Sequence, residues 1–340
     1  MKHTAAILIP AAFITVLGAQ PIIPGASGTV YVTERQHGTV AALDAASGAP
    51  VWVASTGLSP IGVTRPHGVG RVYTSDEGSN QMTVVDASTG SPLRSIDMGP
   101  LPHHLMAASN GKLVYVAEFG HNQIGVVDTG TDTRIAGYVA SPLADARTHA
   151  VWITRDGREL YATNSRVNRA APGDVAKLDA GTGVLLCNTM VGADPSEVLV
   201  SEDGRSAYVS VRRENAVKEL DLTGPCPVLT GRAALVGPQP DTLQITSDGR
   251  TLVVTLRGTP AQVSFLDLET FTATIATIPG HTTTGHHWLS ANGKYTFVAV
   301  ENPGGLAVVD NRTGATLAVH AYPAPPGGNR AHGVFHVPGR

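Results

Sequence analysis

The sequence predicts an all-β fold, a seven-bladed β-propeller with four antiparallel strands in each blade. Two independent counts along the 340 residues each find seven repeats, and seven contiguous repeats favour one domain over two. Glycine is abundant, at 38 residues, as expected when every blade needs several tight turns.

The repeating unit is clearest from residue 102 onwards. LMAAS is a short apolar segment, SNGK is a polar turn, and KLVYVAE alternates as a half-buried strand does. HNQIGVVD is a third strand, and the TGTDTRIAGYVA that follows is a turn and a fourth strand. Four short antiparallel strands in roughly forty residues are typical of a propeller blade.

The first count uses the end of each third strand, where a hydrophobic pair precedes Asp and a Gly/Thr-rich turn. These aspartates recur every 42 to 51 residues, at Asp44, Asp86, Asp128, Asp179, Asp221, Asp267 and Asp310. The second count uses the second strands, which read YVTE, VYTS, VYVAE, LYATN, AYVS, LVVT and TFVA. Most of them follow Asn-Gly or Asp-Gly, which favours a hairpin because glycine adopts a positive φ at little steric cost.

The N-terminal residues 1–26 are predicted to be a signal peptide, and residues 27–340 the propeller. A short basic start precedes an apolar run from about Ala5 to Leu17, with small residues near Ala19. The run is short for a spanning helix, so a secretory signal is favoured over the alternative of a membrane anchor. The sequence thus predicts export to a periplasm or beyond, with no stable membrane span after signal removal.

Residues 28–57 supply only three strands, so the first blade lacks an innermost strand. The C-terminal AHGVFHVPG, from Ala331, matches the innermost segments of the other units. We expect it to pair beside GTVYVTE and close the ring, which removes two exposed sheet edges.

The chain has two cysteines, Cys187 in a fourth strand and Cys226 in the turn after the third strand of the next blade. They predict a disulfide between neighbouring blades if the compartment is oxidising, with two unpaired thiols as the alternative. No CxxCH occurs, so no covalent haem is expected. Only 15% of residues are charged and the net charge is −3, which argues against binding of nucleic acid.

The second strands also carry a family resemblance. LYATN at Leu160 and YVTE at Tyr31 resemble the motif of YVTN-type seven-bladed β-propellers, relatives of the bacterial YncE-like proteins. The resemblance covers nearly all of the chain after the predicted signal. It implies the fold but no activity, because one fold hosts many functions.

In a propeller blade, the start of the innermost strand and the end of the second strand meet at one face, near the central channel. Counting fifteen residues forward from the innermost strands pairs His103 with Glu118. The closing strand's His332 is expected to face Glu34. His286 lies one residue out of phase with its turn, so its placement at this face requires a bulge.

Nine of the twelve histidines beyond the predicted signal fall at this face of the ring. Two charged imidazoles about 6 Å apart repel by roughly 2–3 kcal/mol at an effective dielectric of about 20, so a cluster favours neutral rings. Neutral imidazoles near carboxylates suit Cu or Zn. The predicted metal ligands are His103, His149 and His332, followed by His286; the alternative is that these side chains only line a wet channel.

Other residues at this face suggest a reaction. Glu118 and Glu34 are candidate general bases beside a metal that acts as a Lewis acid or a redox centre. Arg212, Arg213 and Arg257 stand where other blades carry Glu, Asp or Asn, and they are predicted to bind an anionic group of a small-molecule substrate. The alternative is that these arginines are solvated rim residues.

A second resemblance is local. The run from His103 through SNGKLVYVAEFG is similar to a motif of bacterial propeller lactonases, which implies roles for His103, Glu118 and Gly120, with His149 matching a second family histidine. The sequence departs from that motif, because Glu118 replaces the usual Asp and Thr148 stands where the family has Arg.

We therefore predict an exported propeller with a His-rich metal site, acting as a metal-dependent oxidoreductase or hydrolase on a small anionic molecule. The alternatives are a non-catalytic scaffold that binds a protein or envelope partner, and a lactonase-type hydrolase. The sequence contains no GxSxG, HExxH or CxxC motif and no phosphate-binding glycine loop.

Overall fold

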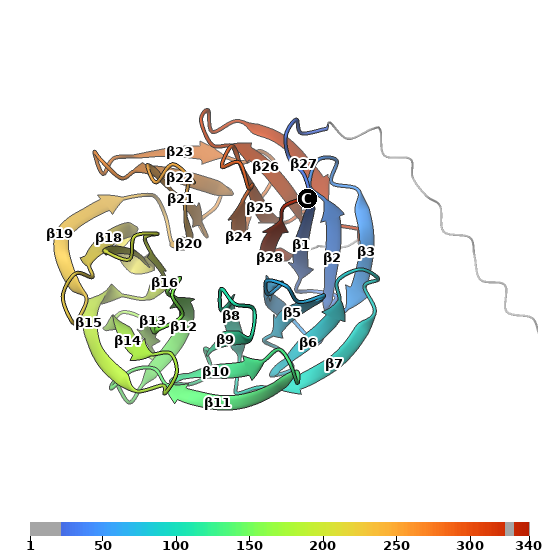
Figure 1. Cartoon of the computed structure of the whole chain (residues 1–340). Helices are drawn as coiled ribbons and strands as arrows, with labels where there is room; N and C mark the ends of the chain where they lie inside the picture. The colour runs from blue at the N-terminus through green and yellow to red at the C-terminus, as the bar shows by residue number, and fades with distance from the viewer. Residues whose placement is uncertain (1–21, 324–329, 340) are drawn as a thin grey trace, which may run out of the picture.

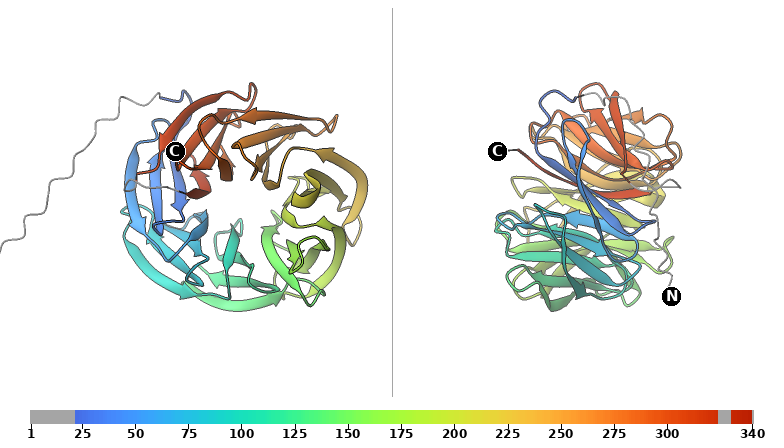
Figure 2. Two further views of the ribbon diagram at one scale, coloured as in Figure 1. Left: turned by 180° about the vertical axis from the view of Figure 1, so that it is seen from behind. Right: turned by 90° about the vertical axis from the view of Figure 1, so that its right-hand side faces the viewer.

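The computed structural model describes residues 22–323 and 330–339. In these residues, 28 strands form seven four-stranded antiparallel sheets, which stand as blades around a central channel (Figure 1). Figure 2 shows the same ring from behind and edge-on. The predicted fold is confirmed. The predicted signal peptide lies almost entirely outside the described residues.

Each blade runs from the channel outwards through four strands. The innermost strands are β4 (Pro60–Thr64), β8 (Pro102–Ala107), β12 (Ala146–Ile153), β16 (Pro195–Val200), β20 (Pro240–Ile245), β24 (Thr283–Leu289) and β28 (Ala331–Val337). The second strands are β1 (Thr29–Glu34), β5 (Arg71–Asp76), β9 (Leu113–Glu118), β13 (Glu159–Arg166), β17 (Ser206–Val211), β21 (Thr251–Leu256) and β25 (Tyr295–Glu301).

The outer half of each blade is built in the same way. The third strands are β2 (Thr39–Asp44), β6 (Gln81–Asp86), β10 (Gln123–Asp128), β14 (Pro172–Asp179), β18 (Ala216–Asp221), β22 (Gln262–Asp267) and β26 (Gly305–Asp310). The outermost strands are β3 (Pro50–Ser55), β7 (Pro92–Asp97), β11 (Thr133–Val139), β15 (Leu185–Ala193), β19 (Val228–Leu235), β23 (Ala273–Thr277) and β27 (Thr316–Ala321). A single 3-10 turn, η1 (Arg212–Glu214), is the one helical element in the described residues.

The C-terminal strand closes the ring as predicted. Strand β28 pairs antiparallel with β1, with Val334 opposite Val32, so blade 1 consists of β28, β1, β2 and β3. Blades 2 to 7 then follow in chain order. The N–H of Arg330 donates to Glu34 Oε1 at 2.8 Å and holds the start of the closing strand in place.

The repeating aspartates have a local structural role. Each carboxylate accepts hydrogen bonds from residues two or three positions further on, in the turn between the third and outermost strands; the Thr131 N–H donates to Asp128 Oδ1 at 2.8 Å, for example. The same arrangement recurs in all seven blades. Asp therefore recurs at this position because its side chain stabilises the turn.

The hydrophobic core lies between blades. Seven clusters of buried side chains each draw on two adjacent blades, so every blade packs on both of its faces. Ile23 and Ala26 belong to the cluster between blades 7 and 1, and the Tyr295 hydroxyl donates to the carbonyl of Pro24 at 2.8 Å. The packed domain thus includes residues before position 27. No helix in the described residues is long and apolar enough to span a bilayer.

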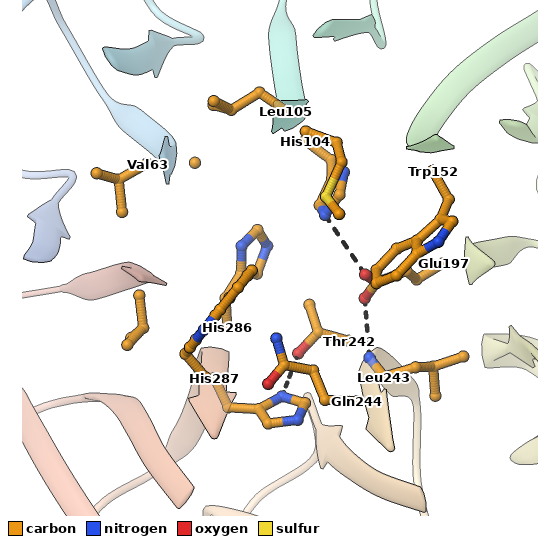
Figure 3. Close-up of a pocket in the computed structure, with 14 residues that line it drawn as sticks. Val63, His104, Leu105, Trp152, Glu197, Thr242, Leu243, Gln244, His286 and His287 are labelled. Atoms are coloured by element: carbon orange, nitrogen blue, oxygen red, sulfur yellow. Dashed lines mark hydrogen bonds and ion pairs between the residues drawn. The ribbon is translucent and has the colours of Figure 1, made fainter. Parts of the chain in front are cut away.

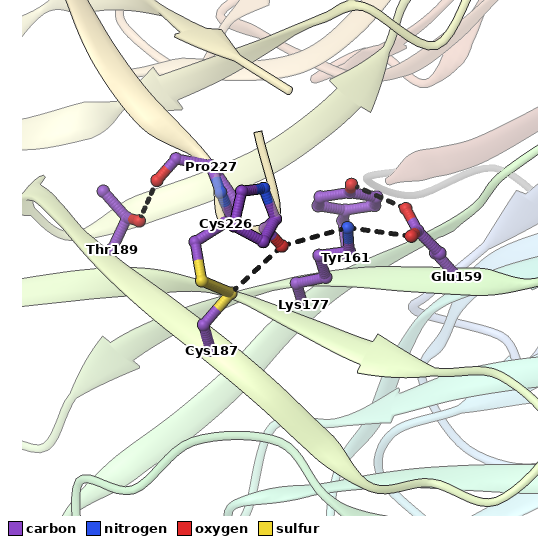
Figure 4. Close-up of a disulfide and its surroundings, with 8 residues drawn as sticks. Glu159, Tyr161, Lys177, Cys187, Thr189, Cys226 and Pro227 are labelled. Carbon is purple, nitrogen blue, oxygen red and sulfur yellow. Dashed lines mark hydrogen bonds and ion pairs between the residues drawn. A yellow bond between two sulfur atoms is a disulfide. The ribbon is translucent and has the colours of Figure 1, made fainter. Parts of the chain in front are cut away.

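Cys187 and Cys226 form a disulfide between blades 4 and 5, with their Cα atoms 6.0 Å apart (Figure 4). The Thr189 hydroxyl donates to the carbonyl of Pro227 across the same junction, and Lys177 Nζ donates to the carbonyl of Pro225 at 3.2 Å. The predicted pairing is confirmed. The bond ties the outermost strand of one blade to the loop before the outermost strand of the next.

Breaking this disulfide is expected to lower the free energy of unfolding by about 3–4 kcal/mol, because it closes a loop over 39 residues. Calorimetry of Cys187→Ser should show a lower Tm. Reductant should lower the Tm of the wild type toward that of the variant and leave the variant unchanged. An equal Tm for both proteins without reductant would contradict a stabilising role.

Candidate functional site

The innermost strands share one irregularity that shapes the channel mouth. Pro102 pairs with Glu118 but Leu105 pairs with Val116, so two residues of β8 lie opposite the single residue Ala117. The same one-residue bulge occurs in all seven innermost strands. In a regular strand, consecutive side chains point to opposite faces of the sheet. At a bulge, two consecutive side chains can point to the same face.

The bulges create two stacked sets of channel residues. The first bulge position is occupied by Ile61, His103, His149, Ser196, Asp241, Gly285 and His332. The second bulge position is occupied by Gly62, His104, Ala150, Glu197, Thr242, His286 and Gly333. His286 therefore occupies the second position, like His104, and this accounts for its offset by one residue in the sequence.

In most blades, a Ser or Thr hydroxyl of the second strand forms hydrogen bonds at the bulge. Ser210 Oγ accepts the N–H of Glu197 at 3.0 Å and donates to the carbonyl of Asp241, in the next blade, at 2.7 Å. Thr163 makes the same pair of bonds, to Ala150 and Ser196. The equivalent residues in blades 3 and 7 are alanines, Ala117 and Ala299, as the bulge registers show. The recurring Ser or Thr of the second-strand motifs thus links neighbouring blades.

Replacing Ser210 with alanine is expected to cost about 1–3 kcal/mol of stability, because it leaves a buried N–H and a buried C=O without a partner. Ser264→Ala is the matched control, since Ser264 Oγ is buried in the next blade without a hydrogen bond. Chemical denaturation should show a clearly larger loss for Ser210→Ala. Equal losses for the two variants would show that the hydroxyl does not link the blades.

The structure brings the four predicted metal ligands to one mouth of the channel. The ring centroids of His103 and His149 are 4.4 Å apart, those of His286 and His332 are 4.7 Å apart, and His103 lies 6.3 Å from His286. All four side chains are buried. Phe119 packs against both His103 and His149 and contributes to the burial of this pair.

These imidazoles are uncharged at neutral pH. Burial lowers the pKa of His103, His149 and His332 well below the ordinary value, and the charges of nearby Arg212 and Arg257 add to the effect. Burial also lowers the pKa of His286 to about 3. Neutral imidazoles in close contact are thus the stable form of this cluster.

The hydrogen bonds assign the ring nitrogens. His149 Nδ1 donates to the carbonyl of Ser196 at 2.8 Å, so its Nε2 carries a lone pair. Arg257 Nη1 donates to His332 Nδ1 at 3.1 Å, so the proton of that ring is on Nε2. His103 Nδ1 is buried and has no hydrogen-bond partner.

Within the described parts of the chain, no three His, Cys, Asp or Glu side chains are arranged to hold a metal ion as they stand. The imidazoles form a row of adjacent rings and do not converge on one point. Metal binding at this cluster stays a prediction, and it requires side-chain rotation.

The predicted arginines divide into two groups. Arg212 Nη2 forms an ion pair with Asp241, and Arg257 Nη2 lies 3.3 Å from Glu301 Oε1. Arg213 is exposed on η1. Two of the three arginines are therefore already neutralised by carboxylates of this chain, and an anionic substrate would have to compete with those carboxylates.

Asp241 lies at the centre of the charged side chains. Burial alone would raise its pKa, but Arg212 and then Arg257 outweigh burial and hold the pKa well below the ordinary value. Ser196 Oγ also donates to Asp241 Oδ1 at 2.5 Å. Asp241 is thus a buried carboxylate that stabilises the arginines at the mouth.

His332 does not face Glu34 as predicted. The bulge in β28 turns its ring toward blade 7, where Nδ1 lies 3.4 Å from Glu301 Oε1. Glu34 instead accepts the N–H groups of Gln36 and His37 at 2.9 and 2.8 Å. Burial alone would raise the pKa of Glu34, but these backbone donors and that of Arg330 lower it overall.

Glu118 occupies a similar position in blade 3. It accepts the N–H of Gly99 at 2.8 Å and contacts His121 Nε2 at 2.7 Å and Arg134 Nη2 at 3.0 Å. Neither Glu118 nor Glu34 lines the channel recesses described below. The predicted role of these two carboxylates as general bases stays a prediction.

Two adjoining recesses open along the channel. The smaller, of about 150 Å³, lies at the histidine mouth and is lined by His103, His149 and Asp241 among others. The larger, of about 410 Å³ with open solvent included, is lined by Trp152 (Figure 3) and also by Trp288. Residues of the second bulge position, including His104, Glu197 and Thr242, line both recesses.

The family of the chain follows from its repeats. The model named PQQ_2, described as outer membrane protein assembly factor BamB, matches residues 36–218, just over half of the 340 residues. The chain belongs to this family. The match runs from the turn after β1 into β18 and ends before Asp241, His286 and His332. A search of curated proteins found no significant match.

Solved structures share the fold of this PQQ_2 family member at low sequence identity. Hydrazine synthase from Kuenenia stuttgartiensis has a TM-score of 0.70 at 18% identity, covering 88% of this chain and 99% of that one. The periplasmic gluconolactonase of Pseudomonas aeruginosa has a TM-score of 0.71 at 17% identity, covering 91% and 99%. A putative 6-phosphogluconolactonase from Bacteroides fragilis has a TM-score of 0.69 at 17% identity, covering 94% and 100%.

The sequence predictions missed several channel residues of this PQQ_2 family member. Glu197 and Thr242 line the larger recess together with two tryptophans, whereas His104 and His287, which also line it, were already among the nine histidines predicted at this face. Glu197 and Thr242 lie at the second bulge position, directly after Ser196 and Asp241. A regular strand would turn these two side chains away from the channel, and the sequence indicated a bulge only at His286.

Proposed function

We propose that this PQQ_2 family member is an exported, transition-metal-binding propeller whose ion is held by imidazoles at one mouth of the channel. The observation that carries the proposal is the row of four buried, neutral histidines, His103, His149, His286 and His332, contributed by four different blades. Neutral imidazole nitrogen is a preferred ligand of Cu and Zn.

The hydrogen bonds leave nitrogens of this row available as ligands. His149 Nε2 carries a lone pair, and His103 Nδ1 is buried without a partner. Rotation of the two side chains, whose rings are 4.4 Å apart, would direct both nitrogens toward one ion. Asp241 and Glu301 lie nearby but are paired with Arg212 and Arg257, so the imidazole nitrogens are the groups that would hold the ion.

The metal would supply a Lewis acid or a redox centre for a small molecule that enters the channel. Arg212 and Arg257 are the residues that would orient an anionic group of that molecule, and they would exchange their contacts with Asp241 and Glu301 for it. We assign no base to the reaction, because the oxygens of Glu34 and Glu118 are held by loop N–H groups.

Metal analysis tests the proposal. Protein loaded with Cu²⁺ or Zn²⁺ and then desalted should retain about one ion per chain. The double variant His103→Ala/His149→Ala should lose most of it, while His67→Ala, which changes an exposed histidine, should retain it. The thermal melt of each variant reports whether it is folded. No retained ion in the wild type, or full retention in a folded double variant, would overturn the proposal.

Lactone hydrolysis is the second candidate function. The segment from His103 to Gly120 is similar to a propeller lactonase motif, and two structural neighbours are a periplasmic gluconolactonase and a putative 6-phosphogluconolactonase. Turnover of gluconolactone that is lost in Glu118→Gln would favour this function. If neither metal retention nor turnover is found, the remaining alternative is a scaffold, tested by pull-down from an envelope extract.

Export is part of the proposal. The disulfide between Cys187 and Cys226 requires an oxidising compartment to persist, and the first residues of the sequence have the form of a secretory signal. N-terminal sequencing of protein recovered from the periplasm or medium should begin between Gln20 and Ser27. Recovery of the uncleaved chain from the cytoplasm would contradict export.

A further inference from the structure

The hairpin of β13 and β14, in blade 4, is longer than its counterpart in blade 3. Strands β13 and β14 each have eight residues, whereas β9 and β10 each have six. The loop that joins β13 to β14, residues 167–171, contains Arg169, and the equivalent loop of blade 3 begins with Phe119. The longer hairpin brings Arg169 into contact with the Phe119 ring of the neighbouring blade.

Arg169 is held by two contacts. Its guanidinium carbon lies 5.2 Å from the centroid of the Phe119 ring, which is a cation–π contact. Its Nε donates to Asp194 Oδ1 at 2.9 Å, in the connection that leads to blade 5. Asp194 is itself buried and accepts the hydroxyl of Ser165 at 2.8 Å, so the anion that holds Arg169 is fixed in place. The side chain of Arg169 is 38% exposed, so salt in the solvent can weaken the ion pair.

Phe119 connects this arginine to the histidines. The centroid of its ring lies 5.6 Å from that of His103 and 5.2 Å from that of His149, and the contact with His149 is T-shaped. The two imidazoles are themselves 4.4 Å apart. Arg169, Phe119 and the histidine pair therefore form one continuous stack, which runs from an exposed loop to the buried rings.

The stack opposes the movement that metal binding at this pair requires. A buried ring in a close-packed environment rotates only if its neighbours move as well. Rotation of His103 and His149 toward one ion changes the contacts of both rings with Phe119. Arg169 covers Phe119 from the loop and limits how far that ring can move.

We propose that Arg169 is a latch for the histidine mouth. Acting through Phe119, it holds His103 and His149 side by side, and its release from Asp194 lets the two rings rotate and take up a metal ion. The inference rests on the proposed function for the identity of the ligand, but the restraint on the rings exists without a ligand. Arg169 is therefore a positioning residue whose removal should make the imidazoles more reactive, whereas loss of a simple support would reduce metal uptake.

Chemical modification of the metal-free protein tests the latch. Diethyl pyrocarbonate reacts with the neutral nitrogen of an accessible imidazole, and mass spectrometry of the peptides gives a rate for each histidine. Arg169→Leu should raise the rates at His103 and His149 about tenfold, which is the order expected for a cation–π contact together with a partly exposed ion pair. The exposed His67 should react equally in both proteins. Unchanged rates at the histidine pair in folded Arg169→Leu would overturn the proposal.

A matched control lies in blade 5. Arg232 lies 4.3 Å from the centroid of the Phe271 ring and 3.3 Å from Glu219 Oε1, and its side chain is 41% exposed. Arg232→Leu removes the same kinds of contact from an outermost strand and should leave the modification of the channel histidines unchanged. Thermal melts show whether each variant is folded. Equal acceleration in Arg169→Leu and Arg232→Leu would indicate a general loosening of the protein and would overturn the latch.

Two further comparisons test the role of the charge. Arg169→Lys keeps the cation and should retain most of the protection of the histidine pair. Sodium chloride screens a partly exposed ion pair, so it should speed the modification of the wild type and have little effect on Arg169→Leu. Rates in the wild type that do not respond to salt would overturn the part assigned to Asp194, and with it the latch.

The outcome is distinguishable from that of the metal proposal. Uptake of Cu²⁺ by Arg169→Leu should be faster than by the wild type and should reach the same level of about one ion per chain. If the wild type retains no ion, the metal proposal is overturned, and the modification rates still decide whether Arg169 restrains the rings. Normal retention by the wild type combined with slower uptake by folded Arg169→Leu would overturn the latch alone.

Discussion

Acidification below about pH 6 is expected to destabilise this propeller steeply. An unfolded chain has histidines with a pKa of about 6.5, whereas burial lowers the pKa of the buried channel histidines far below that value. These residues are His103, His149, His286, His287 and His332. Below pH 6.5 the unfolded state binds more protons than the folded state, so falling pH favours unfolding.

The expected effect is large because the contributions add. Each such histidine contributes about 1.4 kcal/mol per pH unit between the two pKa values. For His286 and His287 this range extends from about pH 6.5 down to about 3. Five groups give a slope of several kcal/mol per pH unit, against a total stability of about 5–15 kcal/mol for an ordinary domain. The stability that these histidines contribute is complete above their pKa in the unfolded chain, about 6.5, and is lost progressively as the pH falls below it.

Calorimetry between pH 8 and pH 4.5 checks this prediction. The Tm should be nearly constant above pH 7 and should fall sharply below pH 6. His286→Gln and His287→Gln should each reduce the slope, because they remove a proton-binding group from the unfolded state, whereas replacing the exposed His67 with Gln should leave the slope unchanged. A Tm that stays constant from pH 7 to pH 5 would show that these rings do not stay neutral in the folded state.

Replacing Asp241 with asparagine is expected to lower the free energy of unfolding by about 3–5 kcal/mol. The change removes the negative charge that Arg212 contacts directly and that Arg257 Nε approaches to 3.9 Å. Among residues 22–323 and 330–339, Arg212 has no other carboxylate partner, and its Nε is buried without a hydrogen bond. An uncompensated buried charge costs more than the ion pair gains, which is why this substitution is expected to be severe.

The same carboxylate gives a second pH signature. The pKa of Asp241 is lower in the folded protein than in the unfolded chain. The stability that this carboxylate contributes is therefore complete above the unfolded pKa of about 3.9, and it is lost as the pH falls through the folded pKa. The full loss in Asp241→Asn should therefore be seen at pH 7, where the histidines are also neutral. This separates the effect of Asp241 from that of the imidazoles.

Urea denaturation of the wild type and three variants provides the measurement. Glu269→Gln, on the surface of the same blade, should change stability by less than about 0.5 kcal/mol. The double variant Asp241→Asn/Arg212→Met should regain part of the loss, because it also removes the charge left unpaired. A loss below about 1 kcal/mol in Asp241→Asn would show that solvent already neutralises Arg212 and Arg257.

The sequence determined the architecture. The recurring aspartates, the Asn-Gly and Asp-Gly turns and the alternating second strands are local signals, so each blade can be recognised within its own forty or so residues. The strand from Ala331 to Val337 could be assigned to blade 1 because it supplies the one innermost strand that residues 28–57 lack. The same signals brought His103, His149 and His332 to one mouth of the channel.

The tertiary structure alone decided which side chains meet there. A one-residue bulge in each innermost strand added Glu197 and Thr242 to the channel lining, and the bulge in β28 turned His332 from Glu34 toward Glu301. Strand periodicity cannot show such a bulge, because one extra residue changes the face of every side chain beyond it.

The partners of the charged groups were likewise beyond the reach of the sequence. Arg212 meets Asp241 and Arg257 meets Glu301 across blade boundaries, at separations of 29 and 44 residues. Glu118 and Glu34 resemble channel carboxylates in the repeat pattern, but Glu34 accepts N–H groups of the loop that follows it and Glu118 accepts the N–H of Gly99, between β7 and β8. Repetition along the chain specifies the backbone of a blade, but the contacts between side chains of different blades depend on the packing of the closed ring.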